Sequence, residues 1–136
     1  MRLFDTTYLI DLVDNDDGAR QLAEKIDEER SYKAISTITA HEYIRGIHYL
    51  YATSQKLLQE KLQRAEAELL RFDILPYSYD MAKIAAELDA TLAKKGQTLD
   101  LADIIIAATA KSRRLSLVTR NTRHYRRIPG LTIEPY

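Results

Sequence analysis

The chain has 136 residues, 46% of them hydrophobic, which is enough for a sizeable core, and we expect a single domain over residues 1–136. It contains no cysteine, which excludes disulfide bonds, thiolate nucleophiles and cysteine-bound zinc. Twenty basic and twenty acidic residues cancel, so the overall charge does not mark a nucleic-acid-binding protein. The charge is uneven, however, because residues 111–127 hold seven Lys or Arg and no acid.

No apolar run approaches the roughly 20 residues that a membrane-spanning helix needs. The first residues, MRLFDTTYLIDLVD, carry acids where the apolar region of a signal peptide would lie. We therefore expect a cytoplasmic protein that makes no contact with a membrane.

Along the chain, strand-like and helix-like patterns alternate. Strands are expected at 1–5, 33–37, 72–78, 115–119 and 131–135. Helices are expected at 6–14, from the turn at 15–18 to about 30, and at 38–52, 54–72, 80–96, 99–110 and, as a short helix, 121–127. Strands that alternate with helices predict an α/β fold whose parallel sheet is covered by helices on both faces.

Asp5 ends the first expected strand. In open α/β sheets, ligands bind outside the carboxyl ends of the strands, so this position favours a functional role. An aspartate before a helix is also a good N-cap. The spacing alone leaves both interpretations open.

Glu42 lies at the edge of the apolar stripe of the helix expected at 38–52. One turn later comes Gly46, and glycine inside a helix costs up to about 1 kcal/mol relative to alanine. Such a glycine indicates the close approach of another group. On spacing alone, a solvated glutamate beside a packing glycine is the simpler interpretation.

Asp100 and Asp103 stand before the uncharged run IIIAATA. Asp100 is well placed to cap the helix, and acids in a first turn complement the helix dipole. This explains Asp103 less well, because its helix is expected to be buried all round and an unpaired buried carboxylate is costly. With no histidine or lysine nearby in sequence, a metal ion is a candidate partner for Asp103.

Three histidines are enough in number to supply the paired general acid and base that catalysis without a metal needs. We expect surface or dimer contacts for His41 and His48, which are seven residues apart on one helix. His124 lies in the basic segment, where a contact to phosphate is possible.

Four segments stand out in order along the chain: LFDTTYLIDL, ITAHEYIRG, LADIIIAATA and LSLVTRNTRHYRRIPGL. Together they resemble the successive motifs of PIN-domain ribonucleases, specifically the VapC-type toxins of toxin–antitoxin modules. The resemblance implies a three-layer α/β/α PIN-like domain with a central parallel sheet. It places the first three acids of the family on Asp5, Glu42 and Asp103.

The fourth acidic position of the family is occupied by Asn121. Asp100 is an additional acid near the implied site, where it serves either as the last metal ligand or only as the helix cap. Thr6 and Thr119 stand beside two of the motif positions and are expected to hydrogen-bond a ligand or a phosphate.

Three converging carboxylates repel one another unless a hard cation neutralises them, and Mg²⁺ or Mn²⁺ prefers oxygen ligands. The implied reaction is attack of a metal-activated water on an RNA phosphodiester. The expected protein is thus a metal-dependent endoribonuclease and a toxin. The alternative is a catalytically silent PIN-fold module that binds a protein or RNA, which Asn121 keeps open.

The resemblance also implies a homodimer and a groove for an antitoxin between helices of the first half. The helix expected at 54–72 carries a leucine stripe, and we expect Leu58, Leu62 or Leu69 to meet a partner helix. The alternative is that the stripe packs only within the domain.

The basic segment divides at its strand. Arg120 and Arg123 follow the strand at 115–119, on the side of the implied site, and are expected to contact RNA phosphates. Arg113 and Arg114 precede the strand and are expected to be solvated only.

Overall fold

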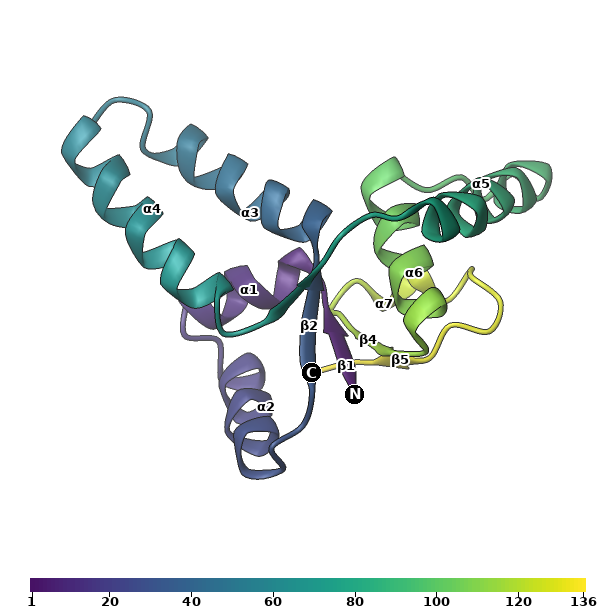
Figure 1. The fold of residues 1–136 in the computed structure, drawn as a ribbon, viewed down its shortest axis with the longest axis horizontal. Coiled ribbons are helices and arrows are strands. Elements are labelled where there is room, and N and C mark those ends of the chain that lie inside the picture. Colours follow the sequence, from purple (N-terminus) through teal and green to yellow (C-terminus); the bar gives the residue numbers. More distant parts are fainter.

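A parallel sheet of five strands, in the order β3-β2-β1-β4-β5, divides the molecule (Figure 1). The computed structural model describes residues 1–136. The strands are β1 (Arg2–Phe4), β2 (Lys33–Ser36), β3 (Asp73–Leu75), β4 (Ser116–Val118) and β5 (Ile133–Glu134). The helices are α1 (Thr6–Val13), α2 (Asp17–Glu28), α3 (Thr37–Leu50), α4 (Gln55–Leu69), α5 (Tyr79–Lys94), α6 (Leu101–Arg113) and α7 (Thr122–Tyr125).

Neighbouring residues of each central strand enter different cores, because side chains alternate across a sheet. On β1, Leu3 joins a core with α5, α6 and α7, whereas Phe4 joins a second core with α1 to α4. β2 and β4 divide in the same way. The result is the expected three-layer α/β/α arrangement, with both faces of a parallel sheet covered, as Figure 1 shows.

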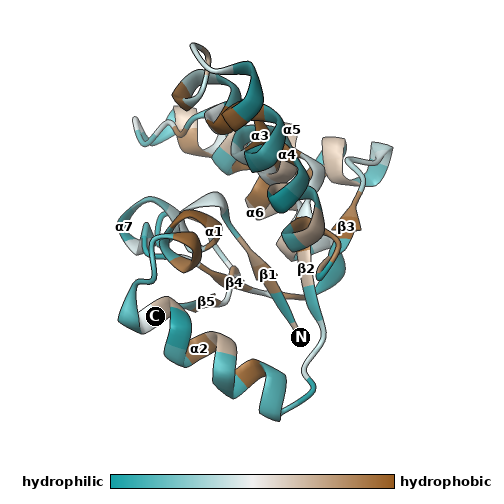
Figure 2. Ribbon diagram, turned by 90° about the vertical axis from the view of Figure 1, so that its left-hand side faces the viewer, coloured by the Kyte–Doolittle hydropathy of each residue, from teal (hydrophilic) through white to brown (hydrophobic).

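Hydropathy follows these layers. Figure 2 shows β1 as largely hydrophobic, whereas α2 is mostly hydrophilic with a few apolar positions. No helix is both long and apolar enough to cross a membrane.

Helix α6 is longer at its end than expected, since it continues to Arg113 instead of stopping at residue 110. The sequence pattern stopped where charged residues begin, but Lys111 is half-buried with its ammonium group on the Pro129 carbonyl, and Arg113 is exposed. The helix ends at Arg114, which adopts a left-handed conformation with φ 54°. The strands are shorter than expected because only two to four residues of each lie in the hydrogen-bonded sheet.

The leucine stripe of α4 faces the interior. Leu69 is buried in the core below α1 to α3, and Leu58 and Leu62 are half-buried against the same core. The expectation that these leucines meet a partner helix is therefore wrong for Leu69. Leu58 and Leu62 pack against the same core within the domain.

The topology brings the ends of β1, β2 and β4 together. β1 pairs with β2 on one side and with β4 on the other, all parallel, so their carboxyl ends meet at one edge. Asp5 follows β1, α3 follows β2 directly, and Thr119 follows β4. The backbone N–H of Asp5 donates to the carbonyl of Val118 at 3.2 Å, which fixes two of these ends to each other.

Replacing Arg114 by glycine should stabilise the protein. A left-handed conformation costs a residue with a Cβ roughly 1–2 kcal/mol, part of which glycine's greater chain entropy offsets. We expect Arg114→Gly to raise the free energy of unfolding in urea by about 0.5–1 kcal/mol. The matched change Arg113→Gly, inside the helix, should lower it by up to about 1 kcal/mol. Equal effects of the two changes would show that the φ of Arg114 is unimportant.

Candidate active site

Asp5 lies at the end of β1 with only 3% of its surface exposed. Its Oδ1 accepts hydrogen bonds from the Thr7 hydroxyl at 2.6 Å and from the Tyr8 backbone N–H at 3.2 Å, and its Oδ2 accepts one from the Thr119 hydroxyl at 2.5 Å. Asp5 is therefore the N-cap of α1 and a buried strand-end acid at the same time. The N-cap interpretation of Asp5 is confirmed, and its functional role stays a prediction.

The charge of Asp5 has little compensation. Burial raises the pKa of its carboxyl group, the three hydrogen bonds oppose this shift, and the nearby negative charge of Asp103 adds to it. No Lys or Arg side chain forms an ion pair with Asp5. Its ionised form is thus held by hydroxyl and amide groups alone.

Asp103 stands in the first turn of α6, and its side chain is 21% exposed. The Tyr125 hydroxyl donates to Oδ1 at 3.0 Å, and His124 Nδ1 lies 3.2 Å from Oδ2. The same Nδ1 lies 2.8 Å from Nδ2 of Asn121. α7 thus surrounds the Asp103 carboxylate with polar groups.

Glu42 projects from the second turn of α3 and accepts a hydrogen bond from the Thr6 hydroxyl at 2.7 Å. The negative charge of Glu42 acts on the Tyr125 hydroxyl, as do the charges of the two aspartates. Burial raises the pKa of the Tyr125 hydroxyl, and the negative charges of all three carboxylates raise it further. Thr6, which binds Glu42, follows Asp5 directly, and the Tyr125 hydroxyl binds Asp103, so the three acids lie in one region of the molecule.

This acidic triad, defined as Asp5, Glu42 and Asp103, contains no Lys or Arg partner. The only ion-pair contact among the three is that of Asp103 with His124. As the side chains stand, no three His, Asp or Glu residues are close enough to hold a metal ion. The donors are nevertheless carboxylate oxygens without a Lys or Arg partner, and carboxylate oxygens are the ligands that Mg²⁺ and Mn²⁺ prefer.

The two residues considered for the last ligand position differ in setting. Asp100 occupies the N-cap position of α6, but its side chain is exposed and makes no capping hydrogen bond. The amide of Asn121 contacts His124. Thr119, expected to bind a ligand, instead donates to Asp5 and accepts from the Asn121 backbone N–H at 2.9 Å.

The two arginines expected to contact RNA phosphates, Arg120 and Arg123, differ as well. Arg120 pairs with Asp16 at 2.7 Å and with Asp11 at 3.3 Å, and its guanidinium lies over the Tyr136 ring. Arg123 is exposed and forms no ion pair. Of these two, Arg123 is therefore the one that is free to meet a phosphate without losing an existing partner.

A hollow of about 360 Å³ opens next to Asp5. Its walls include Thr7, which contacts Asp5, together with Arg120 and Asn121. Asp11 also lines this hollow, and it accepts a hydrogen bond from the Tyr136 hydroxyl at 2.7 Å. Polar groups therefore continue outward from the acidic triad toward solvent.

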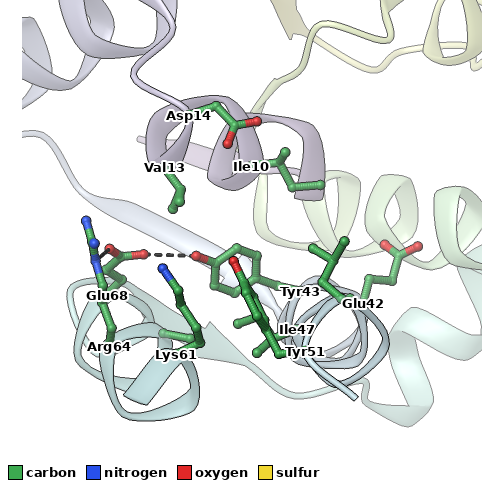
Figure 3. A pocket seen from close by; sticks show the side chains of 13 residues that line it. Ile10, Val13, Asp14, Glu42, Tyr43, Ile47, Tyr51, Lys61, Arg64 and Glu68 are labelled. Carbon is green, nitrogen blue, oxygen red and sulfur yellow. Dashed lines mark hydrogen bonds and ion pairs between the residues drawn. The ribbon is translucent and has the colours of Figure 1, made fainter. Parts of the chain in front are cut away.

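A second, narrower pocket of about 220 Å³ runs between α1, α3 and α4 (Figure 3). Figure 3 shows Ile10 and Val13 of α1 opposite Tyr43 and Tyr51, and the Tyr43 hydroxyl donates to Glu68 at 2.9 Å. We call this pocket the α1–α3–α4 groove. It is mostly apolar and ends at Glu42, so it leads to the acidic triad.

Gly46 lines this groove, and a Cβ added there would meet no atom within 4 Å. The expected close approach of another part of the chain is therefore wrong. The missing side chain leaves space in the groove instead.

The sequence did not indicate Thr7, His124 and Tyr125 as neighbours of the acids. Tyr125 differs from its neighbours only in being an aromatic residue inside a basic segment. This pattern does not show which way the ring points. His41 and His48 are exposed on α3 and make no side-chain hydrogen bond. His124 contacts Asp103, and the phosphate contact considered for it stays a prediction.

Comparison with known proteins supports this description. The PIN domain family matches residues 2–131. The chain is 32% identical over 134 residues to the tRNA(fMet)-specific endonuclease VapC of Salmonella typhimurium, covering 98% of this chain and 96% of that protein. It is also 32% identical over 134 residues to ribonuclease VapC1 of Methanocaldococcus jannaschii, covering 98% and 85%.

Solved structures agree over the whole length. DNA-bound VapBC from Salmonella typhimurium matches with a TM-score of 0.84 at 30% identity, covering 99% of this chain and 98% of that chain. VapBC2 from Rickettsia felis, bound to a DNA fragment from its promoter, matches with a TM-score of 0.85 at 25% identity over the same shares. From the family match, these relatives and its fold, the chain belongs to the PIN domain family, as a VapC-type member.

Proposed function

We propose that this protein is a divalent-metal-dependent endoribonuclease that acts as the toxin of a toxin–antitoxin pair. One observation carries the proposal: three carboxylates converge at the ends of parallel strands without a Lys or Arg partner. Such a group attracts a hard cation, which in turn binds a phosphodiester. Relatives named as ribonucleases support RNA as the substrate.

Each residue of the triad has a separate part. Asp5 and Asp103 are best placed to hold the ion, because Asp5 is buried at the end of β1 and its carboxylate feels the charge of Asp103. Thr7 and Thr119 fix the orientation of Asp5, and Thr6 fixes that of Glu42. Mg²⁺ or Mn²⁺, when bound, supplies an activated water and neutralises the phosphate.

Replacing Asp103 by asparagine tests this assignment. Loss of a direct ligand should reduce RNA cleavage by at least the roughly 10- to 100-fold that loss of a mere supporting partner costs. The melting temperature in EDTA should not fall, because the change removes a repelling charge next to Asp5. We expect no loss of cleavage in Asp80→Asn, which removes an exposed acid from the first turn of α5.

Cleavage within threefold of wild type in Asp103→Asn would contradict the metal assignment. It would favour a catalytically silent module that uses the same fold to bind RNA or a protein. A lower melting temperature in EDTA would make Asp103 a structural acid.

The α1–α3–α4 groove is the proposed binding site for a helix of the antitoxin. Structures of related chains are toxin–antitoxin complexes, such as the one from Klebsiella pneumoniae, with 35% identity and a TM-score of 0.74. The groove is apolar along its floor and carries Lys61, Arg64 and Glu68 at its edge, which suits an amphipathic helix. A homodimer stays an expectation, for which Tyr49 and Leu50 offer exposed apolar surface.

Filling the groove at Gly46 should separate stability from antitoxin binding. Gly46→Leu replaces glycine inside a helix and should raise the free energy of unfolding by up to about 1 kcal/mol. The new side chain would occupy groove space and weaken antitoxin binding, measured by calorimetry. Gln63→Leu, an exposed change on α4 outside the groove, is the control. Unchanged antitoxin affinity in Gly46→Leu would place the partner elsewhere.

Arg123 is the proposed phosphate contact next to the acidic triad. Each such contact on single-stranded RNA contributes about 0.7 to the slope of log affinity against log salt. In an Asp103→Asn background, Arg123→Ala should flatten the slope by about this amount, whereas Arg113→Ala, at the other end of β4, should not. For Arg120→Ala we also expect weaker binding, reduced by the loss of its pairing with Asp11 and Asp16. Equal slopes for wild type and Arg123→Ala would show that RNA enters by another face.

A further inference from the structure

The Asp103 carboxylate has two hydrogen-bond partners of very different character. His124 is 44% exposed at its side chain, so water can replace it. Tyr125 has no exposed surface, and its ring packs in the core with Leu117 and Ile128. A side chain fixed on all sides by core packing has one hydroxyl position, and that position lies 3.0 Å from Oδ1 of Asp103.

This contact restricts the side chain that matters most for metal binding. An aspartate in the first turn of a helix can rotate about two bonds, so its oxygens have several possible positions. A donor on Oδ1 from a side chain that cannot move limits these positions. A carboxylate has about four acceptor positions, so the hydroxyl leaves the remaining lone pairs free for a cation.

We propose that Tyr125 is a positioning residue, whose buried hydroxyl anchors Oδ1 of the Asp103 carboxylate and leaves Oδ2 free to turn toward the divalent ion. The inference rests on the proposed function and adds to it a role for α7, which bears Tyr125 and His124. The core packing of Tyr125 thereby orients Asp103, one member of the acidic triad, through one hydrogen bond.

Tyr125→Phe tests the inference because it removes the hydroxyl and keeps the ring. Loss of a supporting partner of a metal ligand typically costs 10- to 100-fold in metal affinity or activity. We therefore expect Mn²⁺ binding, followed by electron paramagnetic resonance without RNA, to weaken by about this factor. kcat should fall at fixed Mn²⁺, whereas KM for RNA should not change, since Tyr125 does not reach the substrate.

Tyr32→Phe is the matched control. Its hydroxyl donates to Asp73 at 2.8 Å, at the far edge of the sheet, so it also loses a tyrosine–aspartate hydrogen bond. It should bind Mn²⁺ and cleave RNA as wild type does.

Three results would overturn the inference. Wild-type Mn²⁺ affinity in Tyr125→Phe would show that the hydroxyl does not position the ligand. A chain that loses its fold on this change would assign the hydroxyl to the core alone. A wild-type protein that neither binds Mn²⁺ nor cleaves RNA would remove the proposed function itself, a result visible before any variant is made.

Discussion

The structure depends on one electrostatic constraint, a nearly inaccessible carboxylate at the end of the central strand with a second acid close to it. Burial and the charge of Asp103 both raise the pKa of Asp5, and no Lys or Arg offsets them. A fold selected for stability alone would place an apolar residue or a complete ion pair there, because an uncompensated buried charge is destabilising. The arrangement is understandable if a cation completes it.

The rest of the fold serves this constraint. The strand order puts β1 between β2 and β4, so the chain segments that follow all three strands reach the same edge. Hydroxyl groups of Thr7 and Thr119 hold Asp5 without adding charge, and Thr6 does the same for Glu42. Neutral donors orient a carboxylate and leave its negative charge available. A lysine or arginine in their place would compete with the metal.

Much of this could be predicted from the sequence. Alternating strand and helix patterns predicted the parallel sheet and its two helical layers, because burial on both faces requires short apolar strands. The strand-end rule marked Asp5, and the cost of an unpaired charge in a buried helix marked Asp103. Both arguments use only local sequence and general physics.

Other features depend on tertiary packing and could not be predicted in this way. The direction of the Tyr125 ring is set by the core of α5, α6 and α7, and nothing local in the segment NTRHYRR fixes it. The leucines of α4 have the same spacing whether they face a partner or their own domain, so the pattern did not distinguish these cases. A glycine inside the helix at position 46 predicted the close approach of another group, but the structure has open space there.

The central claim is that the acidic triad acts through a bound divalent cation. Cleavage of a labelled RNA by the purified wild-type protein, in EDTA and after addition of excess Mg²⁺ or Mn²⁺, tests it most directly. The account predicts no cleavage in EDTA and recovery when the cation is restored, with RNA binding measurable in both conditions. Cleavage that continues at full rate in EDTA would contradict it.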